Sequence, residues 1–319
     1  MARQMNKTKL CIGWIFVFLS LAFAALLIIR TLKLNPEAII TPISETFATL
    51  NIPFIHPLFQ KSTSLEEIVP KTLSGNEGTY GIVIKNLQTE ETYLSNEHHK
   101  FQSGSLYKLW VMATAFDQIK NGLLKENTLL EQEIPILNEK FRIATADAER
   151  IEGKITLSVA DALNQMITLS DNYAALLLSE KVRLSNVAKF LNTHGFSESK
   201  VGTDGSIPIT TPSDIAEFFT KLYEGTLIDK EYDKKILDLL KQQKLNNKIP
   251  KNLPENIAVA HKTGEFNSFT HDGGIVYTPY GDYIIVILSE SQDPLNTEEA
   301  IADLSKAVYG HFTGVNPSL

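Results

Sequence analysis

The chain has almost no cysteine, since Cys11 is the only one among 319 residues. An intramolecular disulfide is therefore excluded, and so is a metal site built from several cysteines. Positive charge is scarce as well. The formal net charge is −7, and residues 1–36 hold five basic residues and no acidic one, so the remaining chain sums to −12. A body this acidic argues against a nucleic-acid surface, and we expect no nucleic-acid partner.

Several catalytic motifs are also missing. No Gly-x-Ser-x-Gly surrounds Ser105, so the nucleophile elbow of α/β-hydrolases is unsupported. No His-Glu-x-x-His spacing occurs, and we interpret His98-His99 and the histidine of His271-Asp272 as solvated loop residues. A glycine-rich phosphate loop is absent too. We therefore predict neither a metal nor a cofactor.

One long hydrophobic run is present, over residues 11–29. At a rise of 1.5 Å per residue a helix of this length spans about 28 Å, close to the hydrocarbon thickness of a bilayer. We predict a single-pass membrane anchor here, with a short cytoplasmic tail over residues 1–10 and an extracytoplasmic body. Two alternatives stay open. Ala22-Phe23-Ala24 resembles the cleavage site of a signal peptide, which would give a secreted protein, and the run could also be a buried core helix.

The rest of the chain divides into a linker and one large domain. Residues 30–61 contain Pro36, Pro42, Pro53 and Pro57, which discourage long regular elements and indicate a linker. We place the domain at residues 62–316. Strands with a hairpin connection are predicted at residues 80–84 and 92–94.

Helices and further strands follow from hydrophobic periodicity. Helices are predicted from Ser105 to Asn121 and at residues 158–168, 172–182, 185–193, 213–224, 232–243 and 297–311. Strands are predicted at residues 257–263, 273–278 and 282–288. Strands at both ends of the domain predict an α/β (α+β) fold, with a sheet assembled from the two ends and a helical lobe between them. The junction of the two is the natural place for a cleft.

The first motif with catalytic chemistry is Ser105-Leu106-Tyr107-Lys108, at the start of a predicted helix. Residues three apart share a helix face, so the Lys108 amine is expected beside the Ser105 hydroxyl. A desolvated lysine can take the serine proton, and the helix N-terminus suits a developing oxyanion. On its own this pair is common by chance.

The second motif is Ser170-Asp171-Asn172, between two predicted helices. Asp171 suits a helix cap under any interpretation. The functional interpretation gives Ser170 the transfer of a proton to the leaving nitrogen, and gives Asn172 a hydrogen bond to the substrate backbone.

The third motif is Lys262-Thr263-Gly264, which follows the apolar residues 257–260 and is expected at a strand end. Lys262 and Thr263 can bind a carboxylate, and Gly264 would let a ligand come close. No arginine follows Arg183, so an anion site in this half of the chain must rely on lysine.

The three motifs in this order resemble those of the class A β-lactamase family and of penicillin-binding proteins. The resemblance extends over residues 80–94, 101–109, 166–178, 210–216 and 262–277, and covers about residues 62 to 316. It implies an antiparallel sheet flanked by helices plus an all-helical lobe. It also implies that Ser105 attacks a β-lactam or D-Ala-D-Ala carbonyl to give an acyl-enzyme, with an oxyanion hole from the main-chain N–H groups of Ser105 and Glu265.

One departure from that family bears on turnover. Class A β-lactamases carry a Glu-x-x-Leu-Asn motif after the second motif, whose glutamate activates the deacylating water, and residues 196–206 contain no such motif. The two acids in this stretch are Glu198, near a helix-to-loop transition, and Asp204. Without a positioned base, acylation can proceed while hydrolysis of the acyl-enzyme stalls.

We therefore predict a β-lactamase-like serine hydrolase with slow deacylation. Its expected partners are a β-lactam or a peptidoglycan stem peptide, and the membrane through the N-terminal helix. A D,D-carboxypeptidase or penicillin-binding protein of cell-wall metabolism is the first alternative. A β-lactam-binding sensor without turnover is the second.

Overall fold

The computed structural model describes residues 64–315. The predicted tail, membrane anchor and linker, at residues 1–10, 11–29 and 30–61, lie outside the described residues. Among residues 64–315, no helix combines the length and the apolar character needed to cross a bilayer.

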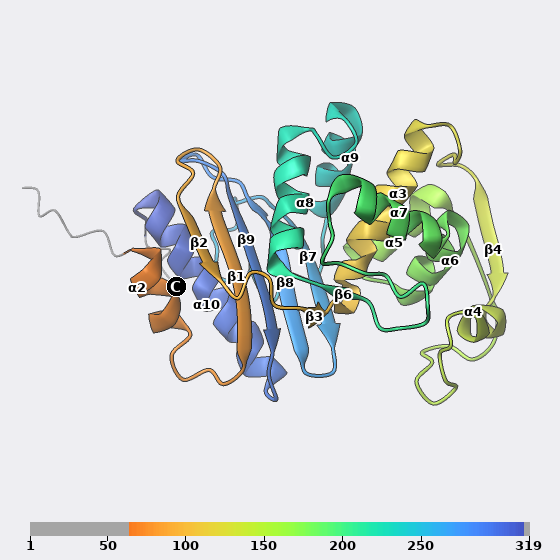
Figure 1. The fold of residues 1–319 in the computed structure, drawn as a ribbon, viewed down its shortest axis with the longest axis horizontal. Helices are drawn as coiled ribbons and strands as arrows, with labels where there is room; N and C mark the ends of the chain where they lie inside the picture. The colour runs from red at the N-terminus through yellow and green to blue at the C-terminus, as the bar shows by residue number, and fades with distance from the viewer. Residues whose placement is uncertain (1–63, 316–319) are drawn as a thin grey trace, which may run out of the picture. The chain divides into compact units, whose positions relative to one another are not determined.

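A five-stranded antiparallel sheet in the order β2-β1-β9-β8-β7 is formed from both ends of this region (Figure 1). From the N-terminal side come β1 (Thr79–Asn86) and β2 (Thr92–Ser95). From the C-terminal side come β7 (Val259–Phe266), β8 (Phe269–Val276) and β9 (Tyr283–Glu290). The predicted sheet built from the two ends is confirmed.

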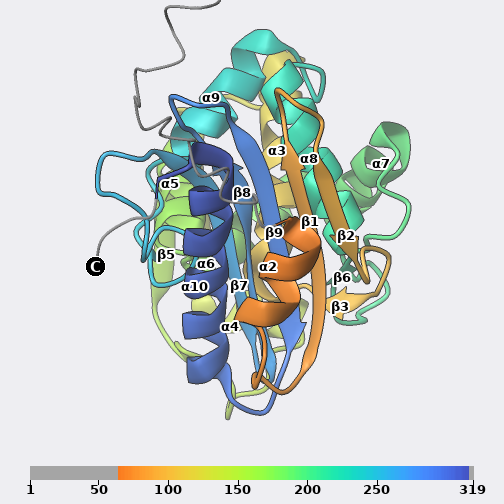
Figure 2. The ribbon, with the colours of Figure 1, turned by 90° about the vertical axis from the view of Figure 1, so that its left-hand side faces the viewer.

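The sheet is covered on both faces, which explains why its central strand is almost wholly apolar. In β9, Ile285 and Ile287 join the core beneath α2 (Leu65–Thr72) and α10 (Pro294–Thr313), the two helices that lie together on one face in Figure 2. The alternate residues Val286 and Leu288 join the larger core on the other face. There α8 (Pro212–Glu224) packs on β1, β8 and β9.

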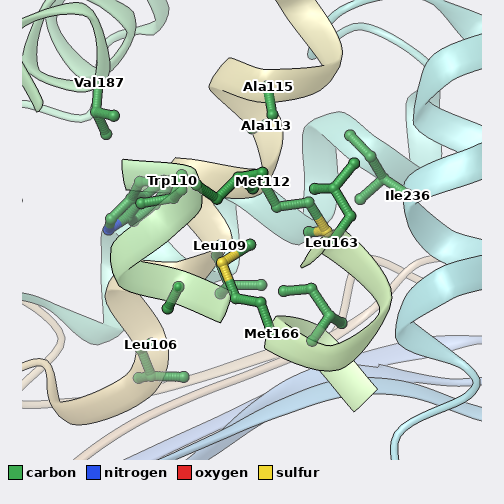
Figure 3. Close-up of a cluster of buried hydrophobic side chains, with 14 of the residues drawn as sticks. Leu106, Leu109, Trp110, Met112, Ala113, Ala115, Leu163, Met166, Val187 and Ile236 are labelled. Carbon is green, nitrogen blue, oxygen red and sulfur yellow. The ribbon is translucent and has the colours of Figure 1, made fainter. Parts of the chain in front are cut away.

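The helical lobe continues that larger core. Its central helix is α3 (Tyr107–Lys120), which is buried from Lys108 to Phe116. Figure 3 shows Trp110, Met112 and Leu163 within the buried interior of the lobe. Against α3 pack α5 (Val159–Thr168), α6 (Asn172–Val182), α7 (Leu184–His194) and α9 (Lys230–Leu240), and α4 (Ile134–Lys140) packs on α6.

The structure corrects two details of the prediction. The lobe is not all-helical, because β4 (Leu129–Glu133) pairs with β5 (Lys154–Ser158). The short strands β3 (Phe101–Gln102) and β6 (Ile209–Thr210) pair with each other as well. These strands are short and partly exposed, so their hydrophobic pattern is weak. The third motif also lies in the middle of β7 rather than at a strand end, because Glu265 and Phe266 continue the strand beyond Gly264.

Candidate active site

Ser105 lies in a single 3-10 turn, η1 (Gly104–Leu106), directly before α3. Gly104 has a φ of +48°, and a Cβ atom there would lie 2.8 Å from the main-chain nitrogen of Glu265. Only glycine combines that backbone conformation with so close an approach. The turn is thereby held against β7, and Ser105 is placed beside the main chain of Glu265.

Gly264 is required for the same contact. A Cβ atom at this position would lie 2.8 Å from the carbonyl oxygen of Ser103 and 2.9 Å from Leu106 Cγ. We expected the glycine to admit a ligand, but the space beside it is filled by η1 of the same chain. Gly264 thus fixes the distance between the nucleophile turn and the sheet.

The second motif connects α5 to α6. Asp171 is the N-cap of α6, and its side chain accepts a hydrogen bond of 2.7 Å from the N–H of Ala174, which confirms its structural role. Ser170 has a φ of +59°, an uncommon conformation for a residue other than glycine. This backbone directs both the carbonyl oxygen and the hydroxyl of Ser170 toward lysine side chains. Such strain is typical of functional positions.

Ser170 joins two lysines from distant parts of the chain. Lys108 Nζ donates to the Ser170 carbonyl oxygen at 2.5 Å, to Ser170 Oγ at 3.1 Å and to Asn172 Oδ1 at 2.8 Å. Lys262 Nζ donates to the same Ser170 Oγ at 3.0 Å. Since the hydroxyl accepts from both amines, its own proton is available for donation to a substrate.

Both lysines are buried among neutral partners, and both have lowered pKa values. Burial lowers the pKa of Lys108 to about 8, although the charges of Asp171 and Glu149 oppose the shift. Burial, and next the positive charge of Lys108, lowers the pKa of Lys262 to about 7. An amine with such a pKa is partly neutral near pH 7 and can accept a proton. The Ser105 hydroxyl, which has no hydrogen-bond partner within residues 64–315, is the nearby group that such a base would serve.

The edge of β7 supplies a main-chain donor beside Ser105. Tyr277 N–H donates to the Ala258 carbonyl oxygen, so the even-numbered residues of β7 make the hydrogen bonds to β8. Glu265 is odd-numbered, and its N–H therefore points away from β8. Because β7 is the last strand of the sheet, that N–H lies on the free edge. This is the orientation that the predicted oxyanion hole requires.

A cleft of about 520 Å³ lies at the junction of the sheet and the lobe. Ser105, Asn172 and Glu265 line it, whereas Lys108, Lys262 and Thr263 are buried. The structure thus brings all three motifs together at one cleft. Arg142 also lines the cleft and was missed, since it lies in a loop without a motif. Its guanidinium lies against Gly205, where a Cβ atom would be 2.1 Å from Nη1.

Neither acidic residue weighed as a deacylation base lines the cleft. Glu198 accepts hydrogen bonds from Thr211 and pairs with His98, and Asp204 accepts from Ser206 within its own loop. Sequence reasoning missed Glu149 instead. Its Oε1 accepts a hydrogen bond of 2.5 Å from Asn172 Nδ2, the amide that we expected to face the substrate. Glu149 lines a smaller pocket that shares Tyr107 and Asn172 with the cleft.

The prediction for His271-Asp272 is wrong, because both residues are fully buried rather than solvated. His271 Nε2 bonds the Gln102 carbonyl oxygen at 2.8 Å, and its Nδ1 accepts from the N–H of Ser289 at 3.0 Å. Asp272 bonds His261 at 2.9 Å. Both residues lie on β8 between covered faces, so the strand context decides their burial. His98 is exposed, as expected.

A serine beside buried lysines, where an antiparallel sheet meets a helical lobe, is the arrangement of the serine β-lactamase and penicillin-binding protein superfamily. The chain belongs to the beta-lactamase enzyme family, whose model matches residues 63–312.

Individual relatives are distant. β-Lactamase VEB-1 of Pseudomonas aeruginosa is 24% identical over 270 residues, covering 76% of this chain and 89% of the relative. Among solved structures, a β-lactamase from Sphaerobacter thermophilus superposes with a TM-score of 0.68 at 22% identity, covering 78% of this chain and 97% of that one. The structure of PBP-A superposes with a TM-score of 0.67 at 19% identity, covering 78% and 96%. These structures share the fold.

Proposed function

We propose that this protein is a serine hydrolase that attacks the carbonyl of a β-lactam, or of a D-Ala-D-Ala peptide, and forms an acyl-enzyme on Ser105. The observation that carries the proposal is the shared Ser170 hydroxyl, with Lys108 at 3.1 Å and Lys262 at 3.0 Å. A base and a proton donor are thereby held in one hydrogen-bonded chain next to the nucleophile turn.

The steps follow from this chain of groups. Neutral Lys108 takes the proton of Ser105 as Oγ bonds to the carbonyl carbon. The N–H groups of Ser105 and Glu265 stabilise the oxyanion. As the C–N bond breaks, Ser170 gives its proton to the leaving nitrogen and recovers one from a lysine. Lys262 and Thr263 bind the anionic end of the substrate.

Deacylation is proposed to be slow. Within the described part of the chain, Glu265 is the one carboxylate that lines the cleft, and its side chain is already paired with Lys248. Water in the cleft therefore lacks a free carboxylate to activate it. A protein with the same fold, a PBP-A mutant, was solved as an acyl-enzyme complex with penicillin G.

The test is intact-mass spectrometry of the full chain in detergent, followed over time after addition of benzylpenicillin. We expect one adduct per chain that persists for many minutes, and no adduct in Ser105→Ala. Ser103→Ala is the matched control, because Ser103 is a buried serine two residues away, and among residues 64–315 its hydroxyl bonds only the Gly104 carbonyl oxygen. Absence of any adduct in the wild-type chain would contradict the proposal.

A cell-wall D,D-peptidase is the second candidate, supported by the likeness to PBP-A and by the shortage of a deacylating carboxylate. It predicts release of D-alanine from a D-Ala-D-Ala peptide together with a stable penicillin adduct. Rapid loss of the adduct with consumption of penicillin would instead favour a β-lactamase. A stable adduct without release of D-alanine would favour a sensor.

We also propose that residues 11–29 anchor the protein in a membrane, with the domain on the outer side. The support is the uncharged run of membrane-spanning length in the sequence. N-terminal sequencing of the mature protein tests this, because cleavage after Ala24 would give a secreted protein instead.

A further inference from the structure

A third buried lysine lies beside the cleft and belongs to none of the three motifs. Lys248 precedes β7 and its side chain is fully buried. Its Nζ bonds Glu265 Oε1 at 2.5 Å and lies 3.5 Å from Glu298 Oε1. Unlike Lys108 and Lys262, this lysine is therefore held by carboxylates.

Glu265 differs from its partner Glu298 in position and exposure. Its side chain is 54% exposed and the residue lines the cleft, whereas the Glu298 side chain is 20% exposed. Side chains alternate along a strand, so Glu265 leaves β7 on the same face as Thr263 and opposite Lys262. Glu265, whose N–H lies beside Ser105, thus also places an anion next to Thr263, which we expect to bind a substrate carboxylate.

Two physical consequences follow for a substrate that carries a carboxylate. A buried ammonium group needs an anion, and besides Glu298 it is Glu265 that supplies one, from a solvent-accessible position that another carboxylate can take. Until Glu265 is displaced, its charge opposes the approach of a second carboxylate in a partly desolvated cleft. Lys248 is thus a cation site in which the protein's own carboxylate competes with that of the substrate.

We infer that Glu265 is a specificity-determining residue that discriminates against substrates with a carboxylate next to the scissile bond, by occupying Lys248. Uncharged substrates, such as an ester or amide of the same acid, escape this competition. The inference rests on the proposed function, because it concerns the substrate of the same acyl-enzyme.

The test measures the second-order rate constant for acylation of Ser105 in the full chain, with benzylpenicillin as the anion and its methyl ester as the neutral probe. In Glu265→Gln we expect the ratio of the rate constant for the anion to that for the ester to rise about tenfold. The matched control is Glu299→Gln, because Glu299 lies on α10 away from the cleft, is 56% exposed and forms an ion pair with Lys251. It should change neither rate constant.

A second variant tests whether the faster acylation by the anion depends on Lys248. In the double variant Lys248→Met, Glu265→Gln, the additional advantage of the anion should disappear, because the substrate carboxylate can then no longer take the place of Glu265 beside Lys248. If the lysine change prevents folding, as a melting curve will show, the anion-to-ester ratio of Glu265→Gln alone decides the question.

The outcomes separate the two proposals. No adduct with either probe in the wild-type chain contradicts the proposed function. Adducts that form while Glu265→Gln leaves the anion-to-ester ratio unchanged, or raises both rate constants equally, overturn the role of Glu265 and leave the acyl-enzyme standing.

Discussion

Three equally buried lysines near the cleft have opposite surroundings, and we call the pair Lys108 and Lys262 the centre and Lys248 the rim. At the centre, Lys108 and Lys262 bond neutral oxygens of Ser170 and Asn172. At the rim, Lys248 bonds Glu265 and lies near Glu298. The comparison teaches that burial alone does not decide what a lysine does. Neutral partners leave an amine that can exchange protons, whereas carboxylate partners create a site for exchange of anions.

The largest expected effect comes from a substitution at the centre that leaves the rim unchanged. Lys108→Met keeps much of the side-chain volume and removes the proposed base. We expect the rate constant for acylation by benzylpenicillin to fall by about 10²- to 10⁴-fold, the range for loss of a general base. Stopped-flow or timed mass spectrometry measures it. Lys251→Met, on an exposed ion pair, is the control. A decrease of less than tenfold would remove Lys108 from the role of base.

An effect of intermediate size is expected in the pH dependence of acylation, which reports on the two lysines of the centre. Burial lowers the pKa of Lys108 to about 8 and of Lys262 to about 7, so the neutral amines accumulate as the pH rises through this window. Acylation by the neutral methyl ester should therefore increase from pH 6 upward, with the midpoint of the increase near pH 8, where half of Lys108 is neutral. With anionic benzylpenicillin the increase should be smaller, because Lys262 loses its positive charge over the same range. A profile that is flat for the ester between pH 6 and 9 would contradict the assignment.

The smallest expected effect comes from Glu149, the carboxylate in the smaller pocket next to the cleft. The negative charge of Glu149 raises the pKa of Lys108. Glu149→Gln removes this charge while keeping a group that can accept from Asn172. The rising limb of the ester profile should then move to lower pH by a fraction of a unit, and acylation at pH 7 should become slightly faster. Glu152→Gln, an exposed acid in the same loop, should leave the limb in place.

Prediction from the sequence succeeded where the signal was local or motif-based. The helix at residues 172–182 has the predicted limits, since Asp171 caps it and its apolar face is continuous. The three motifs indicated one site, and the structure brings them together through Ser170.

What the sequence did not reveal depends on contacts between distant segments. Glu149 and Asn172, or Lys248 and Glu265, have no spacing that marks them as partners. The burial of His271 likewise depends on its strand being covered on both faces, which a local window does not report. The role of Gly264 became clear only when η1 was found packed against it.

The strand pairing of the sheet also sets the order in which parts of the fold can form during translation. β1 is an early segment, yet its long neighbour is β9, with Thr79 opposite Glu290. A ribosome therefore releases β1 well before its partner exists, while the segments of the helical lobe emerge between them. Contacts so distant in sequence form slowly, and the lobe can gather around α3 first. The edge of β7, and with it the reactive centre, is then completed only after the segments of the helical lobe have been translated.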